Sequence, residues 1–116
     1  MALRIYNTLT QKEEDFTPLN PPSVTLYSCG PTVYGRVHIG NLRAQLFSDV
    51  LKRTLSYLGY KVTQVVNITD VDDKTIKGSL SENTPLKEFT EKYEKFFWED
   101  TEKINILRPD ITPRAT

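Results

Sequence analysis

The chain has 116 residues, of which 38% are hydrophobic and 26% charged, and its 15 basic and 15 acidic residues cancel. This length supports one small globular domain, and a balanced charge does not indicate a broad nucleic-acid-binding face, which usually carries a basic excess. One cysteine excludes an internal disulfide framework and fits a reducing cytoplasm. No apolar run approaches the roughly 20 residues of a membrane span, and the first residues lack the apolar core of a signal peptide.

The first part of the chain contains one strand that is well marked by its sequence. Residues Leu3 to Thr8 alternate weakly between apolar and polar and predict a short edge strand. Residues 11–15 are polar and residues 16–22 include three prolines, so this region is predicted to be a turn-rich connector. Residues Val24 to Cys29 are β-branched and aromatic and predict a buried strand.

A helix is predicted from Asn41 to Leu58, because its apolar residues recur at spacings of three and four. These residues form one stripe: Leu42, Leu46, Phe47, Val50, Leu51, Leu55 and Leu58. The residues expected on the opposite side are Asp49, Lys52, Arg53 and Ser56. Gly59 suits the left-handed residue that ends a helix, and residues 60–67 predict a second strand. Strand, helix and strand form a βαβ unit with parallel strands.

A carboxylate-rich loop, Ile68 to Lys74, follows the second strand and contains Asp70, Asp72 and Asp73. Carboxylates at a strand end can bind Mg²⁺ for phosphoryl transfer. They can also cap the next helix and lie at its positive end, which is the favoured interpretation. A short helix is predicted to follow and to end before Gly78.

The last third of the chain is predicted to be mainly one helix. Residues 79–83 are a polar linker, Thr84 and Pro85 are a typical N-cap and first helical residue, and a helix extends from Leu86 to about Lys103. Its aromatic residues are Phe89, Tyr93, Phe96, Phe97 and Trp98. Their helical spacing favours packing over base stacking. Residues 104–116 are interrupted by prolines and predict no strong element.

The segment from Cys29 to Asn41 contains the only cysteine, Cys29, and the only histidine, His38. It leads from a strand end through a glycine-containing turn to a helix start, which is the arrangement by which α/β folds hold phosphates. Taken singly, a lone cysteine is more often a small buried hydrophobe, and a lone histidine near a helix start is often a surface or capping residue. Both side chains are predicted to open into one shared cleft, because ligands of open α/β sheets bind at the carboxyl ends of the strands.

Five blocks of the sequence occur in the order found in a known family. They are Tyr6–Thr10, Cys29–Tyr34, His38–Asn41, Asn67–Lys74 and Asn105–Asp110. With these blocks the chain resembles the N-terminal part of the cysteinyl-tRNA synthetases, which are class I aminoacyl-tRNA synthetases. The resemblance implies an α/β fold with an incomplete Rossmann-like parallel sheet, in which residues 1–116 form the first half of the class I catalytic domain.

The resemblance also implies an enzyme that activates L-cysteine with ATP and Mg²⁺ to cysteinyl-adenylate and transfers the cysteine to tRNA(Cys). His38, Gly40 and Asn41 match the family's "HIGH" signature, which binds ATP, and His38 and Asn41 are the implied catalytic residues. Asn41 stands where the class signature has a second histidine, so a contact without charge is expected there. His38 is suited to donate to a phosphate oxygen as charge develops in the transition state.

In the family, the cysteine that corresponds to Cys29 is one of four zinc ligands, and the zinc binds the substrate thiolate. A thiolate–zinc bond separates cysteine from serine better than pocket shape can. One cysteine cannot hold zinc by itself, so this chain is expected to bind zinc weakly or not at all. Gly30, Thr32 and Thr69 are implied to line the amino-acid pocket. For the two threonines, ordinary hydrogen bonding at a strand end stays open.

Other readings of the same sequence stay open. The isolated chain is expected to be inactive and to contact tRNA little, because the family's second ATP motif and its anticodon-binding domain are absent from these residues. The alternatives are the related cysteine-activating ligase of mycothiol synthesis and a non-catalytic nucleotide-binding fragment. A short parallel sheet leaves an unpaired edge and uncovered apolar surface, which predicts self-association.

Overall fold

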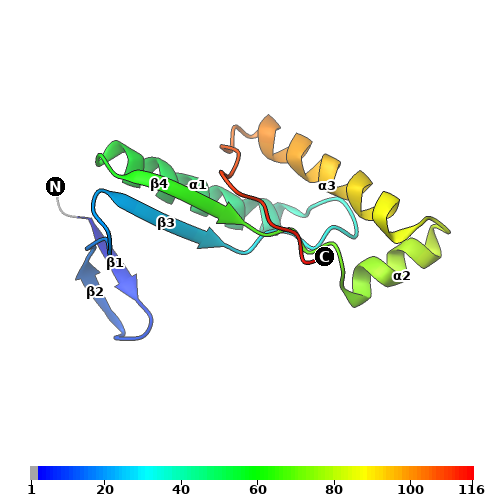
Figure 1. Ribbon diagram of the computed structural model, residues 1–116, viewed down its shortest axis with the longest axis horizontal. Coiled ribbons are helices and arrows are strands. Elements are labelled where there is room, and N and C mark those ends of the chain that lie inside the picture. The colour runs from blue at the N-terminus through cyan, green and yellow to red at the C-terminus, as the bar shows by residue number, and fades with distance from the viewer. Residues whose placement is uncertain (1–2) are drawn as a thin grey trace.

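A computed structural model describes residues 3–116. The elements in chain order are β1 (Arg4–Asn7), β2 (Lys12–Asp15), β3 (Ser23–Ser28), α1 (Ile39–Tyr57), β4 (Lys61–Val66), α2 (Asp73–Ser81) and α3 (Leu86–Lys103). β1 and β2 form a hairpin at one end of the molecule, apart from the other five elements (Figure 1). Within residues 3–116, no helix is long and apolar enough to cross a membrane.

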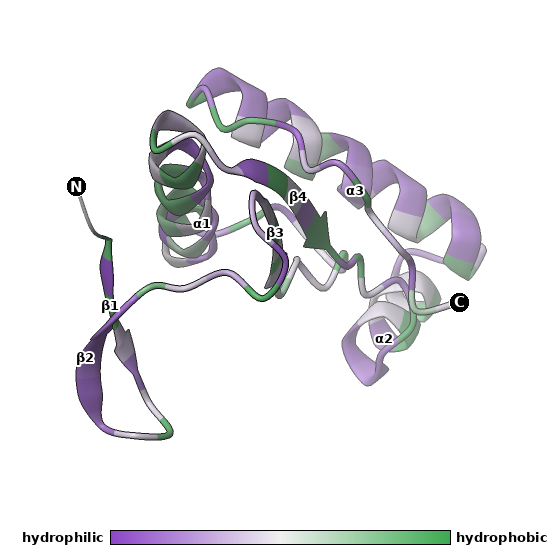
Figure 2. Ribbon diagram, turned by 60° about the vertical axis from the view of Figure 1, so that its left-hand side comes forward, coloured by the Kyte–Doolittle hydropathy of each residue, from purple (hydrophilic) through white to green (hydrophobic). Residues whose placement is uncertain are grey.

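The N-terminal strand was predicted correctly in position, but its surroundings were not. β1 pairs antiparallel with β2, from Arg4 opposite Asp15 to Asn7 opposite Lys12, and belongs to no larger sheet. The predicted connector over residues 11–15 is therefore wrong. Gln11 closes the turn at a φ of 57° and its N–H donates to Asn7 O. Because β2 is hydrophilic throughout (Figure 2), it lacks the apolar alternation by which a strand is recognised.

The predicted βαβ unit is confirmed. β3 and β4 pair in parallel, from Ser23 opposite Lys61 to Ser28 opposite Val66, and α1 connects them. The helix ends as predicted at Gly59, which has a φ of 90°, a conformation in which glycine is free of the Cβ clash. The α/β class with parallel strands therefore follows directly from the sequence pattern.

Residues 110–115 add a strand-like segment along the other edge of β4, where no element was predicted. Val65 bridges Ile111 and Ile68 bridges Arg114, both in the parallel sense. The N–H of Ile68 donates to Pro113 O at 2.8 Å. The segment runs beside β4 in Figure 1. Pro113 concealed it, because proline cannot donate to a ladder and is tolerated only at an edge.

The two sides of α1 are not arranged as the apolar stripe predicted. Phe47 is 72% exposed and Val50 is 54% exposed, and Leu46 is exposed as well. In contrast, Asp49 and Lys52 are only 4% and 9% exposed. An amphipathic helix usually buries its apolar stripe and exposes its polar side, and the middle of α1 shows the reverse.

The cause is the segment after α3, which packs on the polar side of α1. Asp49 accepts the backbone N–H of Leu107 at 2.9 Å and the Nε–H of Arg53 at 2.8 Å. Lys52 donates to Asp110 at 2.9 Å. These charges are buried because each has a partner, which is the condition for burial of a charged group. Sequence periodicity gives no sign of partners that lie more than 50 residues away.

α2 is longer than predicted and passes through Gly78, so residues 79–81 are helical rather than linker. A Cβ at Gly78 would lie 2.4 Å from Cζ of Phe89 in α3. Gly78 therefore allows α2 and α3 to approach closely and does not end the helix.

The start of α3 also differs from the prediction, which gave Thr84 as the N-cap. The hydroxyl of Thr84 donates to Glu82 O, and Pro85 is the N-cap.

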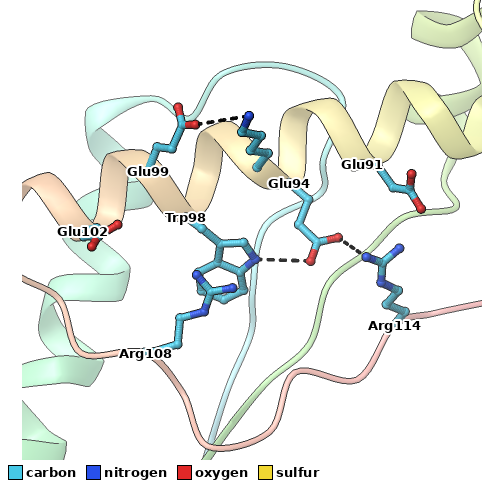
Figure 3. A pocket seen from close by; sticks show the side chains of 8 residues that line it. Glu91, Glu94, Trp98, Glu99, Glu102, Arg108 and Arg114 are labelled. Atoms are coloured by element: carbon cyan, nitrogen blue, oxygen red, sulfur yellow. Dashed lines mark hydrogen bonds and ion pairs between the residues drawn. The ribbon is translucent and has the colours of Figure 1, made fainter.

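The aromatic residues of α3 pack in the core as predicted. The core cluster consists of Val33, Ile68, Phe97 and Trp98. Trp98 also links α3 to the C-terminal segment (Figure 3): its Nε1–H donates to Glu94 at 3.2 Å, and Glu94 pairs with Arg114 at 2.8 Å. The guanidinium of Arg108 stacks on the Trp98 ring, 4.0 Å from its centroid. The strand-like segment of residues 110–115 is thus held by α3 as well as by β4.

We predict that acid loosens residues 110–116 before the β3–β4 pair. The pKa of Asp110 is lowered by the hydrogen bond from the N–H of Gln64 and then by the Lys52 ammonium. Burial raises the pKa of Asp70, but the hydrogen bonds from Thr116 outweigh burial, so the pKa of Asp70 is lowered as well. A carboxyl with a lowered folded pKa stabilises above its unfolded pKa of about 3.9 and loses that contribution as pH falls through the folded value. Hydrogen-exchange protection at Val66 and Ile68 should therefore drop first on acidification. Equal loss between β3 and β4 would contradict this.

Candidate functional site

The parallel pairing of β3 and β4 continues beyond the strands and ends at a cavity. Thr32 bridges Thr69, with the N–H of Val33 donating to Thr69 O at 3.1 Å and that of Thr69 to Pro31 O at 3.0 Å. The two segments that follow Thr32 and Thr69 then diverge toward the N-termini of α1 and α2. Between them lies a cavity of about 200 Å³, which we call the strand-end pocket. Its lining is Gly30, Pro31, Thr32, Tyr34, Gly35, Arg36, Val37, Asn41 and Lys74.

Asn67 fixes the position of Gly30, which lines this pocket. Its Oδ1 accepts the N–H of Gly30 and the hydroxyl of Tyr27, each at 3.0 Å. Its Nδ2 donates to Thr69 Oγ1 at 3.3 Å. A Cβ at residue 30 would lie 1.7 Å from Asn67 O, so only glycine fits there. Asn67 was not among the predicted site residues, although a side-chain amide at a strand end is a signal for such a role.

His38 and Asn41 together cap α1. His38 is the N-cap, and its Nδ1 accepts the N–H of Gly40 at 3.1 Å. Asn41 Oδ1 accepts the N–H of His38 at 3.0 Å, which completes a capping box. The Nδ1 atom is an acceptor and therefore carries no proton, so Nε2 is the protonated nitrogen of a neutral ring. The N–H of Gly40 is thus used within the protein, and a donor at Nε2 of His38 is left.

Cys29 is exposed, and its carbonyl accepts from Nε2 of Gln45 at 3.0 Å. The strand-end pocket gathers three predicted residues, Gly30, Thr32 and Asn41, and its lining does not include Cys29, His38, Gly40 or Thr69. Among residues 3–116, no group of three His, Cys, Asp or Glu side chains is placed to hold a metal.

The carboxylates after β4 act in the fold. Asp72 is the N-cap of α2, where its Oδ1 accepts the N–H of Lys74 at 2.7 Å, and Thr75 completes a second capping box. Asp73 lies in the first turn of the same helix. Asp70 is buried and accepts two hydrogen bonds from Thr116. The positions of Asp72 and Asp73 agree with the capping interpretation, whereas Asp70 accepts from Thr116 instead of capping α2. The three carboxylates are not placed together to hold a metal.

The pocket contains two cationic side chains, Arg36 and Lys74, that the sequence did not identify as site residues. Arg36 pairs with Asp100 at 3.3 Å and stacks on Phe96, 4.1 Å from the ring centroid. The ammonium of Lys74 lies 5.2 Å from the ring centroid of Tyr34. Lys74 falls within one of the recognised sequence blocks, but only the fold brings it across to the loop that contains Tyr34.

Residues 15–116 match the family described as tRNA synthetases class I (C) catalytic domain. The chain therefore belongs to the class I tRNA synthetase catalytic-domain family. Curated relatives named cysteine–tRNA ligase are 54% identical over 99% of the chain in Chlamydia pneumoniae, 52% over 98% in Methanosarcina mazei and 50% over 97% in Ligilactobacillus salivarius. The chain spans about 24% of the length of each of these relatives.

We predict that Gly30→Ala destabilises the protein by about 1–3 kcal/mol or more, because the new methyl group overlaps Asn67 O and the backbone must shift. Gly35→Ala is the matched control, since Gly35 lines the same pocket and a Cβ there meets nothing within 4 Å. It should change the free energy of unfolding by less than about 0.5 kcal/mol. Urea denaturation of both variants makes the comparison. Equal effects of the two substitutions would show that the close approach at Gly30 is unimportant.

Proposed function

We propose that residues 1–116 are the N-terminal half of the catalytic domain of a cytoplasmic cysteine–tRNA ligase, built on a Rossmann-like sheet. The complete protein activates L-cysteine with ATP and Mg²⁺ to cysteinyl-adenylate and transfers the cysteine to tRNA(Cys). The observation that carries this proposal is the 54% identity over nearly the whole chain to a relative named cysteine–tRNA ligase. Relatives with the same name at 44–52% identity support it, and the mycothiol and non-catalytic alternatives gain nothing from them.

In this proposal, ATP binds over the N-terminus of α1, where His38 and Asn41 are held by their mutual cap. The Nε2–H of His38 donates to a phosphate oxygen, and Asn41 contributes a neutral contact from the pocket wall. Such fixed donors act most strongly where negative charge develops, because they need no reorganisation during the reaction. The capping box supplies this rigidity, since both side chains are already fixed by the backbone.

The amino-acid substrate is proposed to bind beside Cys29, Gly30, Thr32 and Thr69. The exposed thiol of Cys29 is available to a metal, but zinc in a closed site needs four ligands. The described residues supply one thiol and no further clustered ligand, so they do not make a zinc site by themselves. Binding of zinc by this part of the protein alone is therefore expected to be weak.

The test of the proposed function is ATP–pyrophosphate exchange by the complete protein that carries this chain. We expect exchange that depends on cysteine and is not supported by serine, and none from the 116-residue chain alone. His38→Ala should lower the exchange rate by about 10²–10³-fold, the usual cost of losing a transition-state donor. Exchange stimulated by another amino acid, or none at all, would contradict the proposal.

The variant His38→Asn separates the chemical role of His38 from its role as a cap. Asparagine is a preferred N-cap residue and should keep α1 stable. Its shorter side chain does not place a donor where Nε2 lies. Normal stability with reduced exchange supports a role in binding phosphate, whereas full exchange in His38→Asn assigns His38 to capping alone.

We propose further that the 116-residue chain associates with itself. α1 has a second, partly overlapping set of apolar residues that are exposed, which we call the exposed stripe. It consists of Ile39, Leu46, Phe47, Val50 and Tyr57. Among the described residues, β4 is the one strand paired with β3, so the outer edge of β3 is open. An exposed apolar stripe and an open strand edge are each typical sites of association between chains.

Val50→Lys should reduce this association, because a charge in the middle of the stripe is costly to bury. Ser56→Lys, on the polar side of the same helix, is the matched control and should leave it unchanged. Sedimentation velocity over a range of concentrations measures both. A wild-type chain that stays monomeric at high concentration would disprove self-association.

A further inference from the structure

The strand-end pocket holds one cation that the fold leaves without an acidic partner. Arg36 is neutralised by Asp100, with both carboxylate oxygens at 3.3 Å from its Nη1, and its guanidinium is covered by Phe96. Within residues 3–116, Lys74 forms no salt bridge, and its ammonium makes no hydrogen bond. The pocket therefore has one positive charge free to meet an anion.

The position of Lys74 is determined from both ends. Its backbone N–H is fixed by Asp72 Oδ1 at 2.7 Å in the capping box of α2, next to the fully buried Thr75. Its ammonium lies over the ring of Tyr34, 5.2 Å from the centroid. A cation–π contact holds an ammonium while leaving its N–H groups free to donate to a ligand. Tyr34 in turn follows Val33, which is anchored in the core.

The need for such a charge follows from the cap of α1. A helix N-terminus usually binds phosphate through its free N–H groups. Here the N–H of Gly40 donates to His38 Nδ1 and those of Asn41 and Leu42 donate to His38 O. The N-terminus of α1 offers fewer free donors than the turn geometry alone suggests, so the attraction for an anion has to come largely from side chains.

We propose that Lys74 contacts a phosphate group of ATP in the strand-end pocket and that Tyr34 positions its ammonium. The inference rests on the proposed function, in which ATP binds over the N-terminus of α1, where Asn41 also lines the strand-end pocket. It adds a phosphate contact from the first turn of α2 to the proposed contacts of His38 and Asn41 at the N-terminus of α1. Because the Thr32–Thr69 bridge joins the segments that lead into these two helices, it holds both sets of donors near each other.

The test measures binding of ATP and of adenosine to the complete protein by isothermal titration calorimetry. Lys74→Met should weaken ATP binding by about ten- to a hundredfold, the range for a hydrogen bond to a charged group, and leave adenosine binding unchanged. Lys74→Arg should recover part of the ATP affinity. Lys77→Met is the matched control, because Lys77 is exposed one turn later on α2 and does not line the pocket.

Two variants of Tyr34 test the positioning role. Tyr34→Phe keeps the ring and should bind ATP like the wild type, whereas Tyr34→Leu removes the ring and should lose affinity for ATP but not for adenosine. In steady-state exchange, the loss in Lys74→Met should appear in KM for ATP and not in KM for cysteine. A change in KM for cysteine alone would assign Lys74 to the carboxylate of the amino acid and overturn the inference.

The outcomes separate this inference from the proposed function. If the wild-type protein does not bind ATP, the proposed function fails. If the wild type binds ATP and Lys74→Met binds it equally well, the proposed function stands and the role of Lys74 is disproved. Equal weakening by Lys77→Met would reduce the effect to net charge and would also overturn the inference.

Discussion

The parallel pairing of β3 with β4, extended by the bridge between Thr32 and Thr69, is the constraint on which the rest of the structure depends. Parallel strands end at the same edge of a sheet, so this one pairing brings together two loops that are about 40 residues apart in sequence. The extension requires a residue without a side chain at Gly30, because its backbone lies against the carbonyl of Asn67. The pocket is therefore a consequence of strand pairing and not of the loops alone.

Both helices that leave this edge begin with a reciprocal cap, and the two caps have different electrical consequences. In α1 the cap consists of the neutral side chains of His38 and Asn41, while in α2 it is the carboxylate of Asp72 with Thr75. A carboxylate at a helix N-terminus compensates the positive end of the helix. The side of the pocket near α2 would thus be unfavourable for an anion if Lys74 did not add a positive charge to that turn. In this way Asp72 caps α2, and Lys74, two residues later, supplies the positive charge that attracts an anion.

The elements that could be predicted from the sequence are those whose own residues decide their structure. The β-branched residues of β3 and β4 and the long apolar repeats of α1 and α3 were sufficient, as was Gly59 for the end of α1. Strand β2 was missed because it lacks an apolar alternation, whereas other errors come from contacts with another part of the chain that the local pattern does not reveal. Gly78 continues a helix because Phe89 packs on it, and Ile111 extends a sheet because β4 offers an open edge. In the site, Gly30, His38 and Asn41 were identified from the family resemblance, while the capping box of His38 and Asn41 and the contact of Lys74 with Tyr34 required the fold.

The burial of the polar side of α1, with its apolar side exposed, has a physical cause. Asp49 and Lys52 hold the segment that leads to Asp110, and that segment continues into the strand beside β4. Because buried charges are tolerated only with partners in place, the segment and the polar side of α1 stabilise each other and order one edge of the sheet. The opposite, apolar side of α1 and the free edge of β3 receive no such cover from residues 3–116. The fold thus has one edge completed by ionic contacts and one open edge that is suited to hydrophobic contacts, and the pocket lies where the two strands between these edges end.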